Sequence, residues 1–137
     1  MISDSSLALQ KALVARLKAD AGVDALIAGR VYDAVPMNAA KPYVSFGPFQ
    51  VLPEEADCSE GVTVIIQLDG WAKGPDTVEV KRLGAAIAKS LQWAEMPLDE
   101  DQRLVIMAVE ALQYLRDPDG ITTHAIVTVR GMTEPTN

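Results

Sequence analysis

His124 and Cys58 carry the side chains of this sequence that are best suited to acid–base or nucleophilic chemistry, and the chain has one histidine and one cysteine. A catalytic histidine works with a nucleophile and an orienting group within reach. No motif surrounds His124, so its place on an alternating strand indicates a surface or interface role. Cys58 lies in an acidic loop, where neighbouring carboxylates disfavour the reactive thiolate. The sequence therefore predicts no catalytic residue.

The carboxylates of the loop 53–61 are the strongest candidates for binding a metal ion. Their spacing lacks the alternating ligands, the glycine and the closing glutamate of an EF-hand, so the pattern favours a solvated acidic loop. One cysteine and one histidine are too few for a zinc site within one chain. The glycine-rich motifs of nucleotide-binding proteins and the serine motif of hydrolases are also missing. We therefore expect no metal and no cofactor. The four carboxylates are Glu54, Glu55, Asp57 and Glu60.

The charge balance limits the kinds of partner that the chain can bind tightly. Its 137 residues include 12 Lys and Arg against 19 Asp and Glu, a formal net charge of −7. Tight binding of nucleic acid or of an anionic membrane uses basic patches, so this balance argues against both. No run of 18 apolar residues predicts a membrane span, and the first residues lack the basic start of a signal peptide. We expect a protein made in the cytoplasm.

The elements follow from the periodicity of the apolar residues. Leucines recur every four residues in a helix at about 5–21, and a second apolar stripe runs along a helix at about 76–92. Strands are expected at 43–52, 62–73, 104–116 and 121–130, with a loose tail at 131–137. The order α-β-β-α-β-β predicts one α+β domain, residues 1–137, with two helices packed on one face of a mainly antiparallel four-stranded sheet.

Two of these strands carry features of a contact surface. Pro48 lies inside the strand 43–52 and gives no ladder donor, so this strand should be an edge strand or bulged there. On the strand 62–73 one face is apolar, whereas the other carries Ile65, Asp69 and Trp71 among polar residues. A mixed face indicates a partner surface or partial cover. For Trp71, burial in the core and a role as interface anchor both remain open, since tryptophan is enriched in both places.

In order and spacing, the segments of the chain resemble the tail-completion, or tail-terminator, proteins of long-tailed phages and of phage-like gene transfer agents. The likeness covers about residues 5–131. It begins with the leucine stripe of the first helix and ends with a hairpin. The segments that carry it are GRVYDAVP at Gly29–Pro36, KPYVSFG at Lys41–Gly47, LDGWAKG at Leu68–Gly74, and RDPDG and VTVRG at Arg116–Gly120 and Val127–Gly131.

The resemblance implies a structural protein of a virion or virus-like particle, located where tail and head join. Six copies would form a ring that caps the tail tube, stops its polymerisation and meets the neck or stopper proteins, while DNA passes through without specific binding. An acidic channel wall would let DNA, a polyanion, slide through the ring without adhering to it. No catalytic residue carries over, so replacing His124 or Cys58 should leave assembly intact. The candidate interface residues are Trp71, Asp69, Glu54, Glu55 and Pro48.

Three alternatives remain open at this stage. Other small neck or connector proteins of such particles have a similar size and composition. A small α+β enzyme or ligand-binding domain would need a pocket with convergent polar groups. A regulatory binding module is a third class, although the acidic composition argues against DNA binding.

Overall fold

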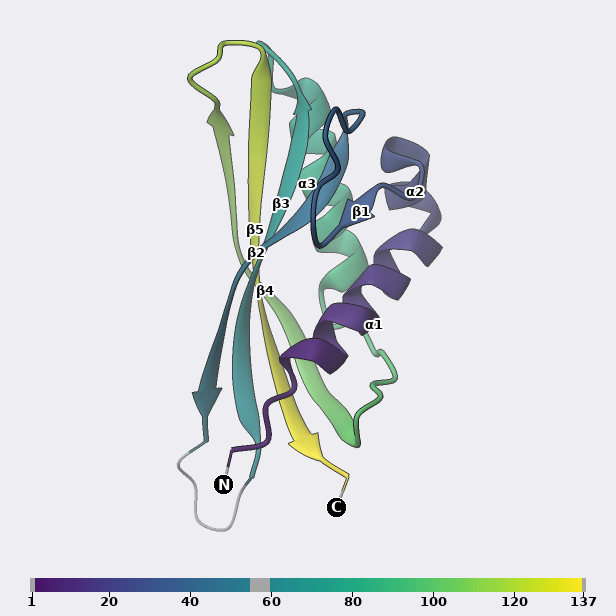
Figure 1. Ribbon diagram of the computed structural model, residues 1–137, viewed down its shortest axis with the longest axis vertical. Coiled ribbons are helices and arrows are strands. Elements are labelled where there is room, and N and C mark those ends of the chain that lie inside the picture. The colour runs from purple at the N-terminus through teal and green to yellow at the C-terminus, as the bar shows by residue number, and fades with distance from the viewer. Residues whose placement is uncertain (1, 55–59, 137) are drawn as a thin grey trace.

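The described part of the protein is an α+β structure in which three helices lie on one face of a five-stranded mixed sheet (Figure 1). The computed structural model describes residues 2–54 and 60–136. The helices are α1 (Ser6–Ala19), α2 (Ala21–Ile27) and α3 (Val78–Leu91). The strands are β1 (Val31–Tyr32), β2 (Tyr43–Pro53), β3 (Val62–Lys73), β4 (Gln102–Arg116) and β5 (Thr122–Pro135).

The strands lie in the order β1-β2-β3-β5-β4. β1 pairs with β2 in parallel, and every other pair is antiparallel. The hairpins β2–β3 and β4–β5 therefore meet through β3 and β5, which pair along their whole shared length from Val62–Thr133 to Lys73–Thr122. α3 makes the crossover between the two hairpins.

The expected four-stranded antiparallel sheet with two helices is wrong in detail, because the predicted order of elements left out the short elements α2 and β1. α2 has seven residues and β1 has two, so neither is long enough to show a clear apolar period. The parallel pairing of β1 depends on a hydrogen bond from the Val44 N–H to the Arg30 carbonyl at 2.9 Å. The C-terminal segment is also not loose, since β5 continues to Pro135 and pairs with the start of β4.

The core lies between the helices and the sheet face they cover. Side chains alternate along a strand, so every second residue of β3 and β5 points toward the helices. The leucine stripe of α1 and the apolar stripe of α3 meet this face, as the sequence predicts. The fully buried side chains include Leu9, Leu13, Leu17, Ile66, Leu68, Leu83, Ile87, Leu91, Val127 and Val129.

A β-bulge interrupts β2 at the proline, as the sequence predicts. The pairing with β3 shifts register between Phe46 and Phe49, so Gly47 and Pro48 have no ladder partners. Proline has no N–H to give to a ladder, which explains why the irregularity falls there. The bulge brings the β2 backbone close to β3: a Cβ added at Gly47 would lie 2.9 Å from Oδ2 of Asp69.

Asp20 caps α2, and its removal should weaken the fold in a pH-dependent way. Its Oδ1 accepts a hydrogen bond from the Val23 N–H at 3.0 Å. That bond, with smaller contributions from Ser90, Gly22 and Arg16, holds the pKa of the Asp20 carboxyl below its ordinary 3.8. We expect Asp20→Ala to lower the free energy of unfolding by about 1 kcal/mol at neutral pH.

A lowered folded-state pKa means that the capping contribution is fully present above the unfolded pKa of 3.8 and is lost as the pH falls through the lower folded value. Urea unfolding of the wild-type and Asp20→Ala chains should therefore differ most at neutral pH and converge in acid below 3.8. Asp20→Asn keeps an acceptor and serves as the control. A gap that stays constant through this acid range would show that the carboxylate does not cap α2.

Candidate interface on the open sheet face

Among the residues that the structure describes, one face of the sheet carries no helix, and we call it the open face (Figure 1). Its side chains alternate with those of the core, so they come from the odd-numbered residues of β3 and the even-numbered residues of β5. Their partners on β2 and β4 follow from the pairing register. Most of them are half-buried within one copy. The face includes Tyr43, Ser45, Gln50, Thr63, Ile65, Gln67, Asp69, Trp71, Ile106, Ala108, Gln113, Leu115, His124, Ile126, Thr128, Arg130 and Met132.

Aromatic rings form a row across four strands of the sheet. The ring centroids of Tyr32 on β1 and Tyr43 on β2 are 5.7 Å apart, and those of Tyr43 and Trp71 on β3 are 6.5 Å apart. Trp71 then stacks on His124 of β5, with centroids 3.8 Å apart and planes within 9°. Burial, and to a smaller extent Tyr32, raises the pKa of the Tyr43 hydroxyl above its ordinary 10.0, so that tyrosine is neutral at physiological pH.

Hydrogen bonds fix the position of the central rings. His124 Nε2 and Asp69 Oδ1 are 2.7 Å apart, and the Gln67 amide donates to the same oxygen at 2.9 Å. The indole N–H of Trp71 donates to Oγ of Ser45 on β2 at 3.1 Å. Asp69 is 7% exposed, so this carboxylate is satisfied mainly by protein groups. The stack and its polar partners form one pre-ordered cluster.

This cluster resembles part of a catalytic triad but lacks its nucleophile. Asp69 orients His124 as a triad acid orients its histidine. Within the described residues, no hydroxyl or thiol is hydrogen-bonded to the other ring nitrogen of His124. The geometry therefore favours a stacking surface over acyl-transfer chemistry. Within residues 2–54 and 60–136, no group of three or more His, Cys, Asp or Glu side chains is placed to hold a metal ion.

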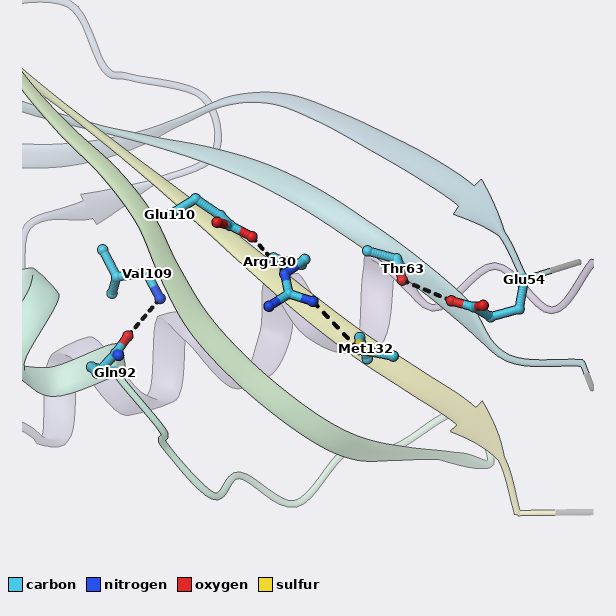
Figure 2. Close-up of polar contacts among 7 residues, drawn as sticks. All are labelled: Glu54, Thr63, Gln92, Val109, Glu110, Arg130 and Met132. Atoms are coloured by element: carbon cyan, nitrogen blue, oxygen red, sulfur yellow. Dashed lines mark hydrogen bonds and ion pairs between the residues drawn. The ribbon is translucent and has the colours of Figure 1, made fainter. Parts of the chain in front are cut away.

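The remainder of the open face is held by ion pairs and side-chain hydrogen bonds (Figure 2). Arg130 pairs with Glu110 of the neighbouring strand and also contacts the sulfur of Met132. Near the end of the β2–β3 hairpin, Thr63 donates to Glu54 at 3.1 Å. Opposite charges are interspersed here, so the open face does not concentrate the acidic residues of the chain.

The structure brings together some of the residues that the sequence singled out. Trp71 and Asp69 lie in one cluster, and the bulge at Pro48 lies beside Asp69. Glu54 lies one residue beyond the end of β2, away from this cluster, and its carboxylate accepts a hydrogen bond from Thr63. Glu55 lies outside the described residues, as do Asp57 and Cys58 of the same loop.

Sequence reasoning missed the part that His124, Ser45 and Tyr43 play in this cluster. Alternation placed His124 on the correct face of its strand, but its stacking on Trp71 requires β3 and β5 to be neighbours. The sequence pattern predicts the strand pairing within each hairpin but not which strands of the two hairpins are neighbours in the sheet. The stack also changes the expectation for His124, whose replacement now removes a ring that supports Trp71.

Comparison with known proteins identifies the class of this fold as a structural tail protein of phage-type particles. The family described as tail completion protein gp17 matches residues 11–134. The chain belongs to that family, which confirms the resemblance seen in the sequence. It is thus a tail completion protein, a component of the tail of a phage or gene-transfer-agent particle.

Solved structures share the fold along nearly the whole chain. A chain in the virion of a native gene transfer agent particle is 27% identical, with a TM-score of 0.86 over 95% of this chain and 97% of that one. The gp17 protein of bacteriophage SPP1 is 23% identical, with a TM-score of 0.57 over 92% of this chain and 88% of that one, and shows the shared fold. The comparison with curated proteins produced no match. Within the described residues, no helix is long and apolar enough to cross a membrane.

Proposed function

We propose that six copies of the chain close a ring on the head-proximal end of the tail tube. The ring stops tube polymerisation and presents a surface to the neck or stopper proteins, and DNA passes through its central channel. The observation that carries this proposal is the likeness to a chain of the gene transfer agent virion over almost the full length of both chains. Family membership supports it across residues 11–134.

The open face suits one side of the contact between copies. A cyclic ring needs heterologous contacts, in which one surface of a copy meets a different surface of the next. The helix layer and the open face lie on opposite sides of the sheet, so each copy has two unlike surfaces (Figure 1). Trp71 and the tyrosines beside it are residue types that concentrate binding energy at the centres of interfaces.

The charge of the chain suits passage of DNA. With a net charge of −7 per copy, a ring repels phosphates overall. A polyanion then moves through without tight contacts, because strong binding to phosphates needs many cations. The chain acts in this proposal through surfaces and not through chemistry.

The experiment that tests the proposal adds the purified protein to polymerising tail tubes and follows tube length and tube ends by electron microscopy. Capping at one end with arrest of growth supports it. Binding only to neck proteins, with tube growth unchanged, would favour another connector role in the same particle.

A further inference from the structure

The outward side of α3 carries three cations in one stripe. Lys81, Arg82 and Lys89 are exposed, with the small Ala85 between them. The opposite side of the helix holds the buried residues Val80, Leu83, Gly84, Ile87 and Leu91. The three cations therefore project away from the sheet, and we call them with Trp93 the α3 cationic face.

These cations have no ion-pair partner among residues 2–54 and 60–136. The Lys and Arg residues that form ion pairs there are Lys11, Arg103 and Arg130. The helices concentrate positive charge in an acidic chain. α1 and α3 together hold six of the twelve Lys and Arg residues, but one of the nineteen Asp and Glu residues. α1 and α3 are thus net positive, while nearly all the carboxylates of the chain lie on other segments.

Trp93 lies at the end of this stripe and is 60% exposed. Its backbone adopts a left-handed conformation, φ 57°, which is uncommon for a residue with a side chain. Two hydrogen bonds to β4 hold it there: the Trp93 N–H donates to the Met107 carbonyl at 2.9 Å, and the Val109 N–H donates to the Gln92 side chain at 2.7 Å (Figure 2). Tryptophan is enriched at interface hot spots, so a fixed and exposed tryptophan near the end of α3 is suited to a protein contact.

We propose that the α3 cationic face docks on a carboxylate-bearing surface of the neighbouring copy in the ring. The proposal rests on the proposed function. It identifies one of the two unlike surfaces that meet where neighbouring copies contact each other in the ring. Charge complementarity favours a second copy as the occupant, because each copy has 19 Asp and Glu residues against 12 Lys and Arg residues. Three cations are too few for the multiple phosphate contacts of a DNA site, and an exposed tryptophan fits a protein surface better.

Zero-length carbodiimide coupling of rings assembled from a mixture of ¹⁴N- and ¹⁵N-labelled protein tests the proposal. The reagent joins a lysine amine to a carboxylate that touches it, and mixed labels identify links between copies. We expect Lys81 and Lys89 to be linked to Asp or Glu of another copy. Links from these lysines to tube or neck proteins in purified tails, or none at all, would overturn the proposal.

Charge reversal supplies a second measurement. The variant Lys81→Glu with Arg82→Glu should weaken ring assembly at least tenfold, while Lys18→Glu, exposed on α1 and outside the α3 cationic face, should change it less than threefold. Circular dichroism establishes that each variant is folded. If the double variant forms rings and caps tubes like the wild type, this inference fails and the capping function stands. If the wild-type chain forms no ring, both fail.

Discussion

Replacing Leu83 by alanine is expected to lower the free energy of unfolding by about 2–5 kcal/mol, the range for truncation of a fully buried leucine. Leu83 is 0% exposed in the middle of α3. It packs directly on the backbone of β3, since a Cβ added at Gly70 would lie 2.9 Å from its Cδ2. Few atoms can move to fill the space, because Gly70 has no side chain and Ala125 beside it has a small one. Urea unfolding followed by circular dichroism measures the loss.

The matched control is Val78→Ala on the same helix. Val78 is 56% exposed, so its truncation should change the free energy of unfolding by about 0.5 kcal/mol or less. Equal effects at the two positions would mean that α3 does not pack on the sheet through the side that contains Leu83.

Replacing Trp71 by alanine is expected to impair assembly more than it impairs folding. The substitution removes the stack on His124 and the hydrogen bond to Ser45, but it leaves the core beneath the helices intact. We expect a loss of about 1–2 kcal/mol in the free energy of unfolding of the isolated chain. In the particle, loss of an interface anchor costs about 2 kcal/mol or more at each contact. Tails of uncontrolled length, or heads without tails, should result.

Two further variants separate the causes. Trp71→Phe keeps a stacking ring and loses the indole donor, so it should assemble much better than Trp71→Ala. His124→Ala removes the other half of the stack and should show part of the same defect. If Trp71→Ala unfolds like the wild type and still gives tails of uniform length joined to heads, the aromatic row is not a contact surface.

The elements that could be predicted from the sequence are the long and strongly periodic ones. The strand 62–73 is β3 with the same bounds, because its alternating valines, isoleucine and leucine are bounded by Gly61 and Gly74. The leucine stripe of α1 and the apolar stripe of α3 predict the side of each helix that packs on the sheet. The chemistry of proline predicts either an edge strand or a bulge at Pro48, and the structure has a bulge there.

The errors arise where tertiary contacts decide the structure. β1 is held by one parallel pairing with β2, a contact between segments that no local pattern predicts. The end of β5 looks irregular in sequence, yet the Thr133 hydroxyl donates to the buried Ser5 hydroxyl at 2.6 Å and ties it to the start of α1. For the candidate interface, the sequence indicates Trp71 as a possible anchor on a strand with one mixed face. It does not indicate that His124 stacks on Trp71, because that contact depends on the order of the strands in the sheet.

The measurement that tests the central claim most directly is the growth of purified tail tubes with and without this protein, followed by electron microscopy of their ends. The account predicts that added protein stops elongation and leaves a six-fold ring at one end of each tube, with the opposite end bare. Tubes that continue to grow at the rate of the untreated sample, with no density at either end or with protein bound along their sides, would contradict it.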